Sequence, residues 1–297
     1  MKVAIIGAGI AGLAIAWHLA EEVTLFGPLG GSASSVSTGL LHPFPGKRGL
    51  LSWRANEGMQ ATRDLLEVAE KSLGRSVANR NGVFRFAMTP EQKANFSTRE
   101  EWREAPEPGL WIPEGMTIYS QLYLKGLFQA CAAKGVQFDE TKIESLNELS
   151  KFDRVVIAAG YETLRFIDLP LEPVKGQTLL CRTKEPIPFS LIGDGHVSPT
   201  EDPYLCQIGS TYEHHFTDIL PHKEVIPQLL NKAAAFYPPA KDFEVVEVRA
   251  GVRLGKKGVS RPYVAQIDER TWVFTGLGSR GLLYHALLGK EIALKIA

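Results

Sequence analysis

Residues 2–12 read Lys2-Val-Ala-Ile-Ile-Gly7-Ala-Gly9-Ile-Ala-Gly12, and this stretch decides the fold. A short apolar run, which predicts a strand over Lys2–Ile6, leads directly into the pattern G-x-G-x-x-G. In that pattern the first glycine permits a tight turn, the second lets the backbone approach a pyrophosphate, and the third lets a helix pack against the strand. A helix over Ile10–Ala20 and a strand over Val23–Phe26 complete a β-α-β unit. The sequence therefore predicts a dinucleotide-binding fold.

Segments far along the chain continue the same α/β pattern. A buried strand of the parallel type is predicted around Val155–Ala158, and a strand over Trp272–Thr275 precedes a helix over Leu282–Ile296. Between them, the pattern changes to antiparallel strands, interrupted by one helix. These strands are predicted at Gln177–Cys181, Tyr204–Ser210 and Phe243–Val248, and the helix near Lys223–Phe236. Two further helices are predicted at 53–73 and 122–134, with a strand at 82–88.

Composition excludes several classes of protein. The 297 residues contain 33 Lys and Arg against 33 Asp and Glu, so no broad electrostatic attraction to nucleic acid or membrane is implied. Cys131, Cys181 and Cys206 are widely spaced and form no metal-ligand or C-x-x-C pattern, which suits a reducing compartment. No apolar run approaches the length of a membrane span. We therefore expect a cytoplasmic protein with no membrane association and no metal.

A second G-x-G-x-x-G pattern, Gly276-Leu-Gly278-Ser-Arg280-Gly281, also lies between a strand and a helix. Only residues 282–297 follow it, whereas a βαβ unit needs about 30 residues. This pattern therefore predicts no second NAD domain, but a helix start whose N–H groups face an electron-rich group such as a flavin ring. The alternative is a tight turn with no ligand. Because no NAD(P)H site is visible, we expect the reducing equivalents to come from the organic substrate.

Four segments together carry a family resemblance: Gly7–Gly12, Ser34–Pro43, Val155–Gly160, and Ala250–Arg253 followed by Gly276–Leu283. The chain resembles the FAD-dependent D-amino acid oxidase superfamily, within it the glycine oxidase and sarcosine oxidase branch. It is also similar to the FAD domain of the bifunctional enzyme that modifies the tRNA wobble uridine. The resemblance implies an α/β, Rossmann-like FAD-binding domain interleaved with a smaller mixed antiparallel-sheet substrate domain. The expected boundaries are 1–80, 120–172 and 247–297 for the former, and 81–119 and 173–246 for the latter.

The resemblance implies which residues hold FAD. Those expected at the pyrophosphate are Gly7, Ala8, Gly9, Ile10, Ala11 and Gly12. Those expected along the phosphates and the isoalloxazine are Ser34, Ser35, Gly39, Leu40 and Leu41. Ala158, Ala159 and Gly160 are expected near the adenine half. Those expected beside the flavin pyrimidine edge are Gly278, Ser279, Arg280, Gly281, Leu282 and Leu283.

One position departs from the family pattern. The acidic residue that usually ends the second strand, and binds the adenosine ribose, is replaced by Gly27. No arginine takes the place of the acid, so no NADP site is implied. Our hypothesis is that a serine hydroxyl such as that of Ser32, or backbone groups, binds the ribose instead.

Two arginines are the expected substrate ligands. Arg253, in Ala250-Gly-Val-Arg253, resembles the family's carboxylate-binding arginine, and Arg280 is a second candidate for contact with an anion. A guanidinium grips a carboxylate with two parallel hydrogen bonds, which would fix the α-carbon over flavin N5. The alternative for each is a structural ion pair. A metal at the adjacent His214 and His215 is not expected, because neighbouring side chains on regular structure point in different directions.

The resemblance implies oxidation of the C–N bond of a small amine or amino acid of the glycine, sarcosine or D-amino acid type. The hydride would pass to flavin N5 and oxygen would reoxidise the flavin. No side chain is assigned as a catalytic acid or base, since the flavin carries the chemistry. One alternative is an oxidase of the carboxymethylaminomethyl group of the tRNA wobble uridine, with tRNA as the partner. Another is a non-catalytic FAD-binding protein.

Overall fold

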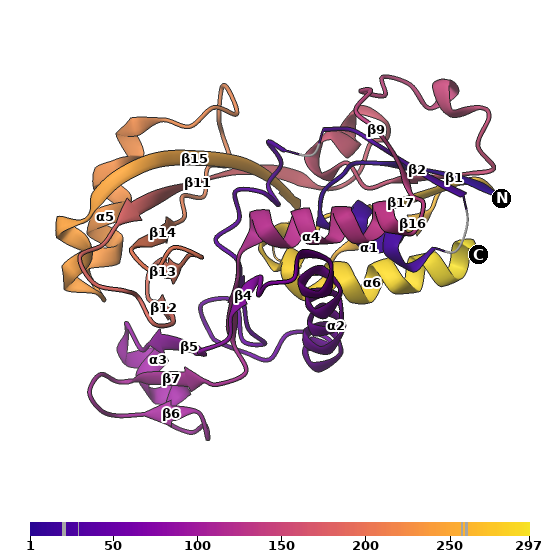
Figure 1. The fold of residues 1–297 in the computed structure, drawn as a ribbon. Coiled ribbons are helices and arrows are strands. Elements are labelled where there is room, and N and C mark those ends of the chain that lie inside the picture. Colours follow the sequence, from indigo (N-terminus) through magenta and orange to yellow (C-terminus); the bar gives the residue numbers. More distant parts are fainter. Residues whose placement is uncertain (20–21, 29, 257, 259–260) are drawn as a thin grey trace.

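The computed structural model describes residues 1–19, 22–28, 30–256, 258 and 261–297 (Figure 1). Its strands form one sheet of six strands, one of eight and one of three. The larger sheets lie at opposite ends of the molecule in Figure 1, with the helical layer against the six-stranded sheet. The prediction of an α/β fold with a parallel sheet and a second, mainly antiparallel sheet is confirmed.

The six-stranded sheet is parallel except at one edge. In sheet order its strands are β16 (Tyr263–Gln266), β17 (Thr271–Thr275), β10 (Arg154–Ile157), β1 (Lys2–Ile6), β2 (Glu22–Phe26) and β9 (Gln137–Asp139). Only β16 runs antiparallel to its neighbour. Apart from Lys2, Arg154 and the two threonines of β17, the strands near the centre are apolar, because both faces of the sheet are covered. Strands from the beginning, middle and end of the chain therefore build one sheet.

Four helices lie on one side of this sheet, and the second of them packs on the third and fourth (Figure 1). They are α1 (Ile10–His18), α2 (Ala55–Leu73), α4 (Ser120–Ala133) and α6 (Gly281–Ile296). Helices α1 and α6 approach closely, since a Cβ on Gly289 would lie 2.9 Å from the Cβ of Ala14. The predicted helices are confirmed within a few residues at their ends. Helix α1 ends at His18, and the predicted end at Ala20 lies outside the described residues.

The eight-stranded sheet is antiparallel apart from one parallel pair, β12 with β5. In order its strands are β15 (Glu244–Gly255), β11 (Glu172–Arg182), β14 (Leu205–Gly209), β13 (His196–Pro199), β12 (Ser190–Ile192), β5 (Val83–Phe86), β7 (Gly109–Ile112) and β6 (Trp102–Arg103). Helix α5 (Ile226–Ala234) packs on one face, against Leu179, Val197 and Ile208. The predicted domain boundaries stay a prediction, and β15 crosses the one at 247.

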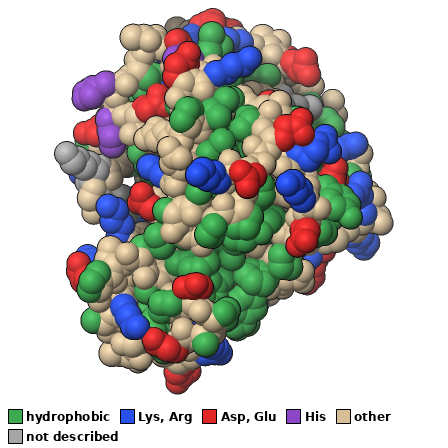
Figure 2. Space-filling view, turned by 90° about the vertical axis from the view of Figure 1, so that its left-hand side faces the viewer, with side chains coloured by type: hydrophobic (Ala, Val, Ile, Leu, Met, Phe, Trp, Pro, Cys, Tyr) green, Lys and Arg blue, Asp and Glu red, His purple; other side chains and the backbone are tan. Residues whose placement is uncertain are grey.

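The remaining elements connect the two sheets. Strands β3 (Leu40–Leu41), β8 (Met116–Ile118) and β4 (Ala78–Asn79) form the small sheet, and α3 (Pro90–Phe96) lies beside β7. No helix in the described ranges is long and apolar enough to span a membrane. Figure 2 shows charged side chains of both signs interspersed on one face of the molecule. All three cysteines are free and buried, and cytoplasmic location stays a prediction.

Candidate active site

The first glycine motif forms a tightly filled turn between β1 and α1. Gly7 has a φ of +113°, and a Cβ there would lie 2.4 Å from the carbonyl oxygen of Ala158. A Cβ on Gly12 would lie 1.9 Å from the carbonyl oxygen of Gly7. No side chain fits at either position, so the turn packs directly on the end of β10. This geometry agrees with the turn and packing roles expected of the two glycines.

The beginning of α1 presents a positive helix end without an acidic neighbour. Its N-cap residue is Gly9, which has no side chain, and its first turn contains no acidic residue. The hydroxyl of Ser34 accepts a hydrogen bond from the Ile10 amide at 3.3 Å, and a Cβ on Gly9 would lie 3.1 Å from that oxygen. Ser34 therefore lies at the helix end where an anion is favoured.

The segment that follows β10 lies beside the same turn. The Ala158 amide donates to the carbonyl of Ile6 at 2.8 Å, and the carbonyl of Gly160 accepts from the Thr275 hydroxyl at 2.9 Å. Gly160 has a φ of +59°, and nothing lies within 4 Å of a Cβ built there. Gly160 therefore borders open space, whereas Ala158 is buried against Gly7.

Gly27 directly follows β2 in the same region. It has a φ of +115°, and its amide donates to the carbonyl of Asp139 at 2.9 Å. The backbone carbonyl of Ser32 accepts hydrogen bonds from the amide and hydroxyl of Ser35, at 3.1 and 2.8 Å. The role of Ser32 at a ribose stays a prediction, because these contacts involve only its carbonyl.

Residues 33–41 contact β15 and end in strand β3 of the small sheet. A Cβ on Gly251 of β15 would lie 2.6 Å from a methyl group of Val36. Gly39 has a φ of +76°, and a Cβ there would lie 1.8 Å from the carbonyl oxygen of Ile118. Leu40 and Leu41 then pair with β8 as strand β3. The segment is thus held against β15 two residues from Arg253.

The second glycine motif lies next to the first. Gly281 begins α6, and a Cβ there would lie 3.2 Å from the side chain of Ile10 in α1. A Cβ on Gly255, the last residue of β15, would lie 3.7 Å from the Cα of Gly278. The first turn of α6, like that of α1, contains no acidic residue. Two positive helix ends therefore meet beside the strand that carries Arg253.

Arg253 lies across the adjacent strand β11. Its guanidinium donates a hydrogen bond to the carbonyl of Thr211 at 3.3 Å and lies 4.6 Å from the ring centre of Tyr212. A Cβ built on Gly176 would lie 2.7 Å from the same guanidinium. Within the part of the chain that the structure describes, no carboxylate forms an ion pair with it. The described residues therefore offer no support for the alternative that Arg253 forms a structural ion pair.

Sequence reasoning missed His196, which lies within electrostatic reach of Arg253. Burial, and then the charge of Arg253, lower the pKa of His196 to about 4. Its Nε2 is buried without a hydrogen-bond partner in the described residues, and a Cβ on Gly209 would lie 3.0 Å from it. The neutral imidazole therefore offers one unused polar atom on this face of the sheet.

Arg280 borders a cavity of about 390 Å³. The other lining residues are Pro45, Gly46, Lys47, Arg48, Leu50, Leu51, Ser52 and Trp53. Nearby His42 is buried, and burial, followed by the charge of Arg85, lowers its pKa to about 3. His42 is therefore neutral at pH 7, and the positive charge of the region comes from arginines and lysines.

Arg85 is a second residue that sequence reasoning missed. It is buried and donates to the carbonyls of Phe44 at 2.7 Å, Lys47 at 3.2 Å and Gly46. Burial, and then the charge of Arg99, lower its pKa to about 10. Its alternating position in the 82–88 strand was visible in the sequence, but its carbonyl partners were not. Arg85 attaches the cavity-lining loop to the eight-stranded sheet.

The comparisons with known proteins agree with this geometry. Glycine oxidase of Pseudomonas putida is 30% identical over 153 residues, covering 48% of this chain and 41% of that protein. The bifunctional protein MnmC of tRNA 5-methylaminomethyl-2-thiouridine biosynthesis, from Campylobacter jejuni, is 25% identical over 275 residues, covering 85% and 44%. The chain thus spans less than half the length of these two relatives.

The solved structure of glycine oxidase from Geobacillus kaustophilus has the same fold, with a TM-score of 0.84, 22% identity, and coverage of 98% of this chain and 94% of that one. The model of the DAO family, described as FAD dependent oxidoreductase, matches residues 2–294. The chain therefore belongs to the family of FAD-dependent oxidoreductases.

Proposed function

We propose that this protein oxidises the C–N bond of a small amine that carries a carboxylate, such as glycine, sarcosine or a D-amino acid. The observation that carries the proposal is Arg253, a half-buried guanidinium without a carboxylate partner in the described ranges, beside the second glycine motif. An arginine in this setting is suited to hold a carboxylate through two parallel hydrogen bonds. Oxygen as the final electron acceptor belongs to the same proposal.

The residues around the two glycine motifs fit FAD. No side chain fits at Gly7 or Gly12, and two helix ends without acidic residues lie together, which suits a pyrophosphate and an electron-rich ring. When bound, FAD supplies the acceptor for the substrate's electrons. We propose that residues 7–12 with Ser34 and Ser35 hold the phosphates, that 39–41 and 158–160 line the cofactor, and that 278–283 border its ring.

The chain's own contribution is to bind and orient the substrate. Arg253 would hold the carboxylate, with Arg280 as a second contact for an anion. His42 and His196 are neutral at pH 7 because burial lowers their pKa values to about 3 and about 4. They therefore add no positive charge that would repel the substrate's amine. We assign no catalytic acid or base.

The test is anaerobic mixing of the purified flavoprotein with glycine, sarcosine and D-alanine. Loss of the oxidised flavin absorbance with any of them supports the proposal, and unchanged absorbance with all of them contradicts it. Arg253→Ala should raise KM by about 30-fold or more, because loss of a charge pair buried on binding costs roughly 2–5 kcal/mol. It should leave bound FAD in place.

The matched control is Arg249→Ala. Arg249 lies on the same strand, but it forms an ion pair with Glu247 at 2.7 Å. We expect its replacement to change KM little. Loss of FAD from Arg253→Ala would show a structural role and would contradict the assignment to substrate binding.

A second candidate substrate is a tRNA wobble uridine with a carboxymethylaminomethyl group, which contains an N-substituted glycine unit. The observation that favours it is the cavity beside Arg280, where Lys47 and Arg48 lie with the half-exposed Trp53. Cationic side chains with an aromatic ring suit a single-stranded nucleic acid. Reduction of the flavin by such a tRNA, and by no small amine, would support this candidate.

Absence of turnover with every substrate would support the non-catalytic alternative, which membership of an oxidoreductase family disfavours.

A further inference from the structure

The segment 210–222, which follows β14, contacts Arg253 through two groups. The carbonyl of Thr211 accepts a hydrogen bond from the guanidinium at 3.3 Å, and the ring of Tyr212 lies 4.6 Å from its carbon. Tyr212 is exposed, yet its ring lies beside the Arg253 guanidinium in a favourable cation–π arrangement. Because the segment contains no helix and only one isolated bridge, other contacts must fix this position.

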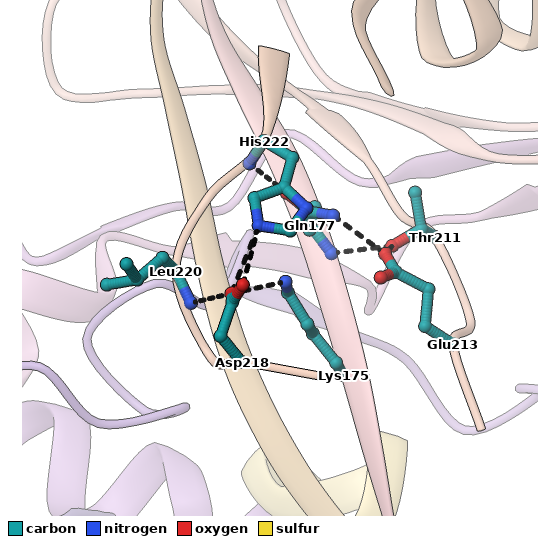
Figure 3. A network of polar contacts seen from close by, with 7 residues as sticks. All are labelled: Lys175, Gln177, Thr211, Glu213, Asp218, Leu220 and His222. Atoms are coloured by element: carbon teal, nitrogen blue, oxygen red, sulfur yellow. Dashed lines mark hydrogen bonds and ion pairs between the residues drawn. The ribbon is translucent and has the colours of Figure 1, made fainter. Parts of the chain in front are cut away.

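The first part of the segment is attached to β11 by backbone and side-chain hydrogen bonds (Figure 3). Lys175 and Glu213 exchange two backbone hydrogen bonds, at 3.0 and 2.9 Å. The Gln177 amide donates to the Thr211 hydroxyl at 2.9 Å, and the Thr211 amide donates to the carbonyl of Gln177 at 3.1 Å. The Glu213 carboxylate accepts from the Thr211 hydroxyl at 2.6 Å and from the Gln177 side chain at 2.8 Å.

The far end of the segment is attached through a charged group of residues (Figure 3). The Asp218 carboxylate accepts from the Leu220 amide at 2.8 Å, from His222 Nε2 at 3.0 Å and from Lys175 Nζ at 3.4 Å. The His222 amide donates to the Gln177 side chain at 2.6 Å. The Lys175 side chain is 0% exposed. A buried ammonium requires its carboxylate partner, so this contact strongly favours one position of the segment.

Alternation along the strand separates these contacts from the site. Lys175 and Gln177 share one face of β11, and Gly176, which supports the Arg253 guanidinium, lies on the other. By the same alternation, the side chains of Thr211 and Glu213 lie on the side of Gln177, and the Tyr212 ring lies on the side of Arg253. The attaching side chains therefore do not contact Arg253 themselves, and they determine where Tyr212 lies.

We propose that Lys175, Gln177, Glu213, Asp218 and His222, here called the anchor cluster, position Tyr212 and Thr211 against Arg253 and thereby set the affinity for the substrate carboxylate. The inference rests on the proposed function, since it assumes that Arg253 binds that carboxylate. The members of the cluster are positioning residues. They act on KM through segment 210–222, and they do not act on the reacting atoms.

The test variant is Asp218→Asn, which removes the charge that faces Lys175 and His222. We expect faster hydrogen–deuterium exchange across 210–222, a KM for glycine or sarcosine raised roughly 3- to 30-fold, and kcat near the wild-type value. The affinity for glycolate, which has the carboxylate of glycine and no amine, should fall by the same factor in calorimetry.

Tyr212→Leu removes the ring and leaves the anchor cluster intact. It should raise KM and weaken glycolate binding similarly without changing exchange elsewhere in the segment. The double variant should be little worse than either single one, because both act through the same contact. The matched control is Asp202→Asn. The Asp202 carboxylate accepts a hydrogen bond from the Tyr204 amide at 2.9 Å, just as Asp218 accepts one from the amide two residues after it. Asp202 forms no ion pair in the described residues.

Unchanged exchange in Asp218→Asn would overturn the proposal, as would faster exchange with unchanged glycolate affinity and KM. If Asp218→Asn fails to fold, Tyr212→Leu decides, and unchanged glycolate affinity in that variant overturns the proposal. A wild-type protein that reacts with no carboxylated amine would refute the proposed function instead. Exchange and glycolate calorimetry would still test the anchor cluster in that case, because neither depends on turnover.

Discussion

The two glycine motifs share the pattern G-x-G-x-x-G but differ in how closely other atoms pack around Gly7 and Gly12 of the first and Gly278 of the second. In the first, backbone atoms fill the space beside the glycines, at 2.4 Å from a Cβ on Gly7 and 1.9 Å from one on Gly12. In the second, a Cβ on Gly278 would meet nothing within 4 Å, although its φ is +54°. Gly7 and Gly12 of the first motif are therefore packing positions, whereas Gly278 of the second motif supplies backbone conformation in open surroundings.

The largest expected effect comes from Gly12→Ala. The added methyl group would meet the backbone oxygen of Gly7, which cannot move without opening the turn. Overpacking typically costs about 1–3 kcal/mol and sometimes more, so we expect a markedly lower thermal unfolding temperature and loss of FAD. Gly30→Ala is the control, because a Cβ there has nothing within 4 Å. Wild-type stability and FAD content in Gly12→Ala would contradict the claim that the first motif has no room for a side chain.

The next effect concerns how the helix after the second motif is held. His285 Nδ1 donates to the carbonyl of Gly281 at 3.1 Å, and its Nε2 accepts from the Tyr123 hydroxyl at 2.7 Å. Burial lowers the pKa of His285 to about 4 from an ordinary value of 6.5. The unfolded chain therefore takes up the proton first, and stability falls as pH drops from 6.5 toward 4.

We expect His285 to account for at most about 3 kcal/mol of that loss. Urea unfolding at several pH values measures the free energy of unfolding, and His285→Gln should reduce the slope of that free energy against pH. Part of the slope should remain, because burial also lowers the pKa of His18, His42 and His196. An unchanged slope in His285→Gln would show that this helix start is not pH-sensitive.

The smallest expected effect is that of Gly278→Ala. A positive φ costs a non-glycine residue roughly 1–2 kcal/mol, but the open surroundings impose no clash. We expect a folded protein with a modest fall in unfolding temperature and, if the ring of FAD lies there, a change in its visible spectrum. If Gly278→Ala unfolded the chain as Gly12→Ala does, the contrast between the two motifs would be wrong.

The sequence was sufficient for elements whose pattern is local. The first β-α-β unit and the helices α2, α4 and α6 were predicted because each shows its own period and its own end signals. The short strands β9, β12 and β13 were not predicted, since three or four residues are too few to show alternation. His196 was missed for that reason.

The surroundings of the candidate site depend on contacts between distant residues. Nothing near Tyr212 in the sequence indicates that its ring contacts Arg253. The ion pair of Lys175 with Asp218 joins residues 43 positions apart. Such pairs follow from the register of β11 and β14, which no local pattern specifies. The binding roles expected of the glycines, serines and arginines stay predictions.

The place of β1 at the centre of the six-stranded sheet has a consequence for biosynthesis. Its neighbour β10 pairs with it across about 150 residues, and β10 pairs in turn with β17, at 271–275. On a ribosome that adds about 5–20 residues per second, the apolar β1 would wait on the order of tens of seconds for the last of these partners. Such high contact order favours slow folding. We therefore expect nascent chains to depend on chaperones until α6 docks on α1.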